Sequence, residues 1–144
     1  MIVSIIKNNT KKIKILLVLL WMILIFVISS FNSTESSNQS GFIVNIISSI
    51  FHINNIDLLS LIIRKLAHFT EYFILGLLTY NMIHSYNKKA YVSIIICILY
   101  AISDEIHQIF LPGRSCQIMD MTIDTLGSLL GIYLLLFIKK KHKI

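Results

Sequence analysis

Four long apolar stretches constrain the fold of this chain more than any other feature of its sequence. They lie at about residues 14–31, 66–86, 91–110 and 118–138. A helix of about 20 apolar residues crosses the hydrocarbon core of a bilayer, which is roughly 30 Å thick. With 56% hydrophobic and 14% charged residues, the chain is also too apolar for a soluble domain of 144 residues. The sequence therefore predicts an all-α membrane protein, with a bundle of four transmembrane helices in a single domain over residues 1–144.

The first apolar stretch has two interpretations. Basic residues before it and the small residues Ser29 and Ser30 at its end are typical of a signal peptide. However, the stretch is long for a signal sequence, and no clear small-x-small cleavage site follows it. We therefore expect a retained membrane anchor, and in both cases the following segment lies outside the cytoplasm.

The segment between the first and second stretches is more polar than the stretches themselves. Residues 32–40 have the composition of a loop. Residues 41–63 mix apolar side chains with asparagines, serines, a histidine and an aspartate, which favours an interfacial helical segment over a membrane span. The later connections are short, with a tight hairpin at residues 87–89 and a turn enforced by Pro112 and Gly113.

The distribution of lysine and arginine predicts the orientation in the membrane, because basic residues concentrate on the cytoplasmic side. With the N-terminus inside, ten of the thirteen basic residues are cytoplasmic and all seven acidic residues fall on the outer half. The ten are Lys7, Lys11, Lys12, Lys14, Lys88, Lys89, Lys139, Lys140, Lys141 and Lys143, whereas Arg64, Lys65 and Arg114 are outside. We therefore expect a multi-pass protein with both termini in the cytoplasm.

This topology brings the polar ends of three helices together at the outer side. His68 and Glu71 are three residues apart, and Asp120 and Asp124 are four apart, so each pair occupies one stripe of its helix. The candidate functional residues are Lys65, His68, Glu71, Asp104, Glu105, His107, Gln108, Arg114, Asp120 and Asp124. Their arrangement indicates a site for a ligand that arrives from outside.

The acidic stripe of the fourth helix continues as Gly127, Ser128 and Gly131. Small residues at this spacing let another helix approach closely, so the aspartates face a neighbouring helix and not lipid. Asp124 lies roughly 10 Å below the start of the helix. An ionised side chain at the bilayer centre costs about 2.5–3.5 kcal/mol, so such a residue persists where it pairs, binds a ligand or lines a wet cavity.

Each polar pair also has a purely structural interpretation, in which it only fixes helix packing. Arg114 is the expected partner of Asp120, because a planar guanidinium can hold a carboxylate with two hydrogen bonds. Lys65 is the other candidate. The gathering of several such pairs on one side of the membrane favours the functional interpretation.

Two elements at the outer end resemble the VanZ-like family of bacterial membrane proteins. They are Asp-Glu-x-His-Gln at residues 104–108 and Pro-Gly-Arg at residues 112–114, and the likeness covers roughly residues 14–138. The other matching positions are Trp21, Phe26, Ser29, Ser30, Gln39, Ser40, residues 64–72, Gly76, residues 101–115, Asp120 and residues 124–131.

The resemblance implies a bacterial cell membrane protein, and it carries over to all ten candidate residues. The family's named member is an accessory factor in glycopeptide resistance that lowers susceptibility to teicoplanin more than to vancomycin. Our leading hypothesis is an envelope protein, surrounded by membrane lipid, that engages a lipid-linked cell-wall precursor or a lipoglycopeptide at the outer leaflet.

Other functions stay open. Outward-facing carboxylates and histidines suit an intramembrane enzyme acting on a lipid or cell-wall precursor, either as general acid and base or by holding a divalent cation. No motif of a known mechanism is present, so catalysis, cofactors and metal binding are left open. Transport is a weaker hypothesis, because four helices are few for alternating access. The lysine runs indicate topology and not nucleic-acid binding, and the sequence leaves homo-oligomerisation undecided.

Overall fold

The structure is a computed structural model that describes residues 2–31, 33–52 and 54–141, with side chains described from residue 8 and omitted for 33–40. The described residues form five α-helices and no strand. The helices are α1 (Ile2–Ser29), α2 (Ser33–Phe51), α3 (Ile56–Ser85), α4 (Ala90–Gln108) and α5 (Ile118–Lys141). The predicted all-helical class is confirmed.

Three of the described helices are long and apolar enough to cross a membrane. Their candidate spans are Asn8–Ser29, Ala90–Gln108 and Ile118–Lys141. Helix α3 has sufficient length but is less apolar, and its polar side chains His68, Glu71 and Asn81 fall within the predicted span. A fourth span at residues 66–86 therefore stays a prediction.

Two expectations for the segment before α3 were wrong. Residues 33–40 belong to helix α2 and not to a loop, and the expected helical segment at 41–63 is divided between α2 and α3. Serine and asparagine disfavour a helix by only a few tenths of a kcal/mol each, so they do not end one without Gly or Pro. The division falls where His52 adopts a positive φ of 53°. The side chain of Asn55 then caps α3 by accepting a hydrogen bond from the Leu58 N–H at 3.1 Å.

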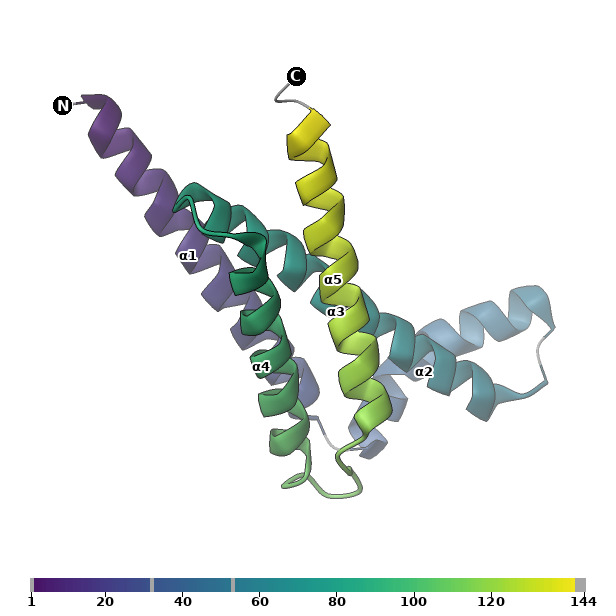
Figure 1. Cartoon of the computed structure of the whole chain (residues 1–144). Helices are drawn as coiled ribbons and strands as arrows, with labels where there is room; N and C mark the ends of the chain where they lie inside the picture. The colour runs from purple at the N-terminus through teal and green to yellow at the C-terminus, as the bar shows by residue number, and fades with distance from the viewer. Residues whose placement is uncertain (1, 32, 53, 142–144) are drawn as a thin grey trace.

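Helix α3 is the central element of the bundle, because it contacts each of the other four helices. Figure 1 shows α2 and the first part of α3 extending together to one side, while α1, α4 and α5 surround the rest of α3. The connection between α4 and α5, residues 109–117, lies at the end opposite to the start of α1 and the end of α5. This end carries the polar residues described below.

Helices α3 and α5 pack with their backbones in close approach. A Cβ atom added to Gly127 would lie 2.4 Å from the carbonyl oxygen of Phe69, and one added to Gly131 would lie 2.2 Å from that of Phe73. On α3, Gly76 is equally tight, at 2.2 Å from the carbonyl oxygen of Ser128. The predicted close contact of the small-residue stripe with another helix is confirmed, and that helix is α3.

Lysine residues gather at the other end of the bundle, where α1 begins and α5 ends. Lys14 on α1 and Lys139 on α5 both donate hydrogen bonds to the Oδ1 atom of Asn81 on α3, at 3.3 and 3.0 Å. Of the predicted cytoplasmic lysines, Lys143 lies outside the described residues and the side chain of Lys7 is not described. The two ends of the bundle therefore differ in charge, as the sequence predicts.

Candidate functional site

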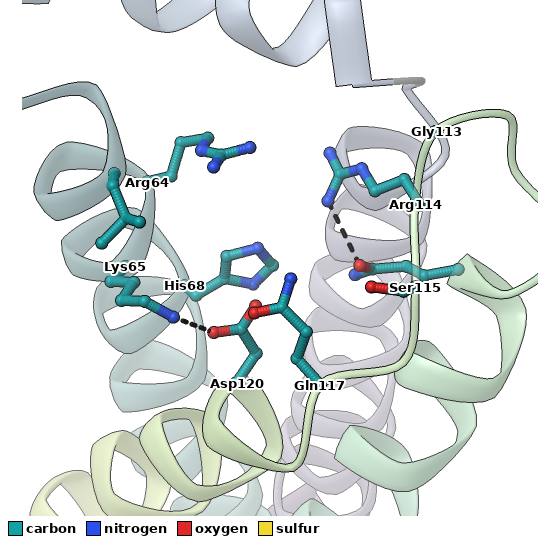
Figure 2. Close-up of a pocket in the computed structure, with 10 residues that line it drawn as sticks. Arg64, Lys65, His68, Gly113, Arg114, Ser115, Gln117 and Asp120 are labelled. Carbon is teal, nitrogen blue, oxygen red and sulfur yellow. Dashed lines mark hydrogen bonds and ion pairs between the residues drawn. The ribbon is translucent and has the colours of Figure 1, made fainter. Parts of the chain in front are cut away.

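A polar cavity of about 310 Å³ opens at the end of the bundle where α3, α4 and α5 meet. It is lined by Leu61, Arg64, Lys65, His68, Gln108, Gly113, Arg114, Ser115, Gln117 and Asp120. Figure 2 shows Arg64 and Lys65 on one wall and Arg114 on the facing wall, with His68 between them. Five of the ten predicted site residues line this cavity: Lys65, His68, Gln108, Arg114 and Asp120.

The cavity wall carries more positive than negative charge. Lys65 forms an ion pair with Asp120, which is the only carboxylate in the lining. In the part of the chain whose side chains are described, no carboxylate lies within 4.0 Å of Arg64 or Arg114. Arg114 instead donates a hydrogen bond from Nη1 to Oε1 of Gln108 at 3.2 Å. Burial lowers the pKa of the Arg114 guanidinium, and the positive charge of Arg64 lowers it further, so the two arginines repel each other across the cavity.

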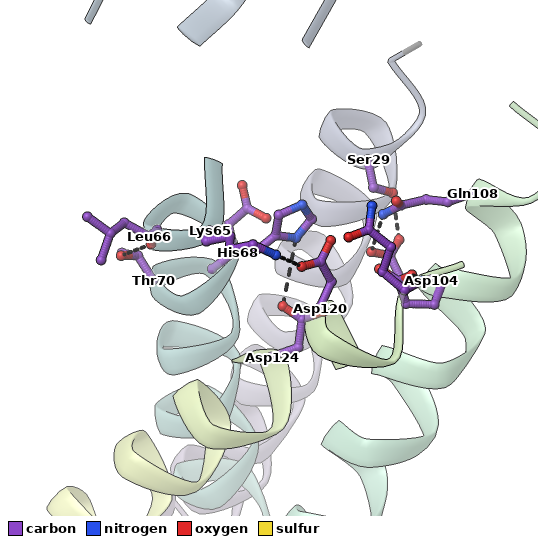
Figure 3. Close-up of polar contacts among 12 residues, drawn as sticks. Ser29, Lys65, Leu66, His68, Thr70, Asp104, Gln108, Asp120 and Asp124 are labelled. Atoms are coloured by element: carbon purple, nitrogen blue, oxygen red, sulfur yellow. Dashed lines mark hydrogen bonds and ion pairs between the residues drawn. The ribbon is translucent and has the colours of Figure 1, made fainter. Parts of the chain in front are cut away.

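Behind the cavity lies a second group of residues, His68, Asp104 and Asp124, which we call the inner cluster. One potential ligand atom from each residue lies within 4.8 Å of the other two. Asp124 is fully buried and Asp104 is 2% exposed. His68 Nδ1 lies 3.7 Å from Asp124 Oδ1, which is too long for a hydrogen bond (Figure 3).

Two hydrogen bonds fix the carboxylate of Asp104. The hydroxyl of Ser29 on α1 donates to Oδ1 at 2.5 Å, and Nε2 of Gln108 donates to Oδ2 at 3.4 Å (Figure 3). Because Gln108 also accepts from Arg114, the contact continues from the inner cluster to the cavity wall. Helix α1 therefore contributes to the inner cluster through Ser29.

Glu105 holds the connection between α4 and α5 in place. Its side chain is fully buried, and Oε2 accepts a hydrogen bond from the backbone N–H of Gln117 at 2.8 Å, directly before α5 begins. An acceptor at this point satisfies one of the free N–H groups at a helix start. The geometry gives Glu105 a positioning role for the wall that carries Arg114.

The remaining two predicted residues lie beside the site. The ring of His107 packs on Phe26, with 4.5 Å between ring centroids. Glu71 is half-buried, and its backbone carbonyl accepts a hydrogen bond from Trp21 Nε1 at 2.9 Å. Both residues contact α1, and neither lines the cavity or belongs to the inner cluster.

The structure corrects one predicted pair and adds two residues. The partner of Asp120 is Lys65 and not Arg114, whose guanidinium is bonded to Gln108. Ser29 and Arg64 were not among the predicted site residues. Arg64 directly precedes Lys65 and had been placed on the outer side, so its charge was a usable signal, and for Ser29 the signal was its place among the positions that resemble the VanZ-like family.

The fold and site together define a helical membrane protein with a cationic cavity above a buried histidine and carboxylate cluster. The model of the VanZ/LLP1 family matches residues 14–139. The chain therefore belongs to the VanZ/LLP1 family. No curated protein and no solved structure matches it significantly.

Proposed function

We propose that the cavity binds the phosphate-bearing head group of a lipid-linked cell-wall precursor at the outer leaflet of a bacterial membrane. The supporting observation is the cavity wall, where three cationic side chains stand against one carboxylate. Lys65 is paired with Asp120, which leaves Arg64 and Arg114 available for an anion. A guanidinium stays charged and presents a planar fork of donors that matches phosphate oxygens.

This proposal accounts for the position of the cavity as well as its charge. Helix α3 has exposed apolar side chains close to the cavity, including Leu61, Ile62 and Leu66. A lipid tail can lie along such a surface while the head group enters the cavity. Binding of a wall precursor's head group in the cavity would alter the access of teicoplanin to its target. We propose that the protein lowers susceptibility to teicoplanin in this way.

An intramembrane enzyme is the second candidate. The observation that favours it is the inner cluster, which places an imidazole beside two buried carboxylates directly behind the cavity. These groups are of the types that act as general acids and bases or as metal ligands.

Removal of Arg64 and Arg114, which have no carboxylate partner among the described side chains, tests the proposed binding. In a susceptible Gram-positive host, expression of the wild-type protein should raise tolerance to teicoplanin more than to vancomycin. The double variant Arg64→Gln with Arg114→Gln should lose this effect, because each charge-assisted hydrogen bond to phosphate contributes about 1.5–3 kcal/mol. Dose–response curves at equal membrane protein levels measure the change.

The matched control removes two positive charges from the other end of α5. Lys140→Gln with Lys141→Gln, both exposed, should keep the tolerance. Full tolerance in the double arginine variant would show that the cavity charge is not used. Equal shifts for teicoplanin and vancomycin would contradict the proposed selectivity.

We also propose that the lysine-rich end faces the cytoplasm, which follows from the charge distribution. Reporters fused after Lys89 and after Ile144 should then read cytoplasmic, and a cysteine replacing Ser115 in a chain without Cys97 and Cys116 should be labelled by an impermeant reagent. Labelling at position 88 from outside the cell would reverse the orientation and place the cavity on the cytoplasmic side.

A further inference from the structure

The carboxylate of Asp124 has no hydrogen-bond partner for either oxygen within the part of the chain that the structure describes. Its side chain is fully buried, so bulk solvent does not reach it. An unpaired buried carboxylate is costly, and buried carboxylates in proteins pair with a cation, bind a metal or stay protonated. Asp124 therefore requires an explanation beyond helix packing.

The geometry around Asp124 fits a bound cation. Zn²⁺ forms bonds of about 2.0–2.2 Å to nitrogen and carboxylate ligands, which places the ligand atoms about 3–4 Å from one another. His68 Nδ1 and Asp124 Oδ1 are 3.7 Å apart, and no pair of ligand atoms in the inner cluster exceeds 4.8 Å. The three atoms therefore need to approach one another by at most about 1–2 Å to reach the separations of a metal site.

The charge of the inner cluster also favours a cation. Two ionised carboxylates beside a neutral imidazole carry two negative charges, and the nearby Lys65 is already paired with Asp120. Among the described residues, no lysine or arginine lies within 4.0 Å of Asp104 or Asp124. A divalent ion neutralises the two carboxylates where the protein supplies no counter-charge.

The residues around the inner cluster resemble the supporting contacts of metal sites. Metal-binding carboxylates are held by further hydrogen bonds that fix their orientation. Asp104 has two such bonds, from Ser29 and Gln108, and each of its oxygens keeps a lone pair for a ligand bond. The buried hydroxyl of Tyr72, one helical turn after His68, has no hydrogen-bond partner within the described residues.

We propose that His68, Asp104 and Asp124 bind one divalent transition-metal ion behind the cavity. One imidazole with two carboxylates suits Zn²⁺ or Mn²⁺, whereas Ca²⁺ prefers a set of oxygen ligands alone. Three protein ligands leave a coordination position open. His68 and Gln108 also line the cavity, so the open coordination position is close to the lipid head group that we propose binds there. The metal site does not depend on the proposed function.

The test uses the full-length protein purified in detergent, stripped with a chelator and then loaded with Zn²⁺ or Mn²⁺. After removal of free metal, elemental analysis should find about one ion per chain in the wild type. Asp124→Asn and His68→Gln should each lower the affinity by more than about 100-fold, and Ser29→Ala by about 10- to 100-fold. Asp57→Asn, an exposed aspartate in the first turn of α3, is the control and should bind like the wild type.

Thermal unfolding separates metal binding from protein damage. Metal should raise the unfolding midpoint of the wild type and of Asp57→Asn, because only the folded chain presents the three ligands together. Without metal, Asp124→Asn should unfold at a midpoint no lower than that of the stripped wild type, because the variant removes an unpaired buried carboxylate. Less than about 0.1 ion per chain in the loaded wild type, with no metal-dependent midpoint, would mean that Asp124 is protonated and would overturn the proposal. Full metal content in Asp124→Asn and His68→Gln would equally overturn it.

Discussion

Replacing Gly131 with leucine is expected to prevent α3 and α5 from assembling. The new Cβ atom would lie 2.2 Å from the carbonyl oxygen of Phe73 and 3.1 Å from the backbone nitrogen of Leu77. Both atoms belong to the backbone of α3, so no side-chain rotation relieves the overlap. Overpacking of a core by a few methylene groups already costs about 1–3 kcal/mol, and displacing a helix costs more. Size-exclusion profiles and thermal unfolding in detergent should show loss of the folded protein.

The helix propensity of leucine makes the interpretation of this variant simple. Leucine is more favourable than glycine in a helix by roughly 0.8 kcal/mol, so the substitution stabilises α5 as an isolated helix. Gly41→Leu is the matched control, because no atom lies within 4 Å of a Cβ atom at that position in α2. An unchanged unfolding midpoint in Gly131→Leu would contradict the close α3–α5 contact.

The parts of the site that follow from local periodicity could be predicted from the sequence. Asp120, Asp124, Gly127 and Gly131 share one stripe of α5 because helical spacing alone determines which residues share a face. The small residues identify the stripe that contacts another helix, and the structure shows that α3 occupies it. The acidic residues of α5 therefore face His68 and Lys65 on α3.

The contacts that depend on irregular backbone could not be predicted in the same way. The position of Arg114 depends on the path of residues 109–117, which the buried carboxylate of Glu105 fixes through the N–H of Gln117. That path directs Arg114 to Gln108 and leaves Asp120 to Lys65. Similarly, Ser29 reaches Asp104 because α1 crosses α4 at that level, and tertiary crossing points have no signature in a single helix sequence.

Breaking the Lys65–Asp120 ion pair is expected to have the second large effect. It also distinguishes a structural role of the pair from a functional one. The two side chains are 23% and 16% exposed, so the pair is shielded from water on most of its surface. Breaking a fully buried pair costs about 3–5 kcal/mol, and the partial exposure of this one reduces the expected cost to about 1–3 kcal/mol. Lys65→Met and Asp120→Leu should each lower the unfolding midpoint accordingly.

The double variant Lys65→Met with Asp120→Leu should recover most of the lost stability, because neither charge is left unpaired. Arg114→Met with Asp120→Leu is the matched comparison, and it should show no recovery, since Lys65 then stays without its partner. Recovery in the second double variant would restore Arg114 as the partner of Asp120. If the ion pair is only structural, the first double variant should also regain full teicoplanin tolerance. If it shapes the wall that binds the ligand, stability returns while tolerance stays low, because the double variant keeps the net charge of the cavity but loses the contact between Lys65 and Asp120 that joins two sides of its wall.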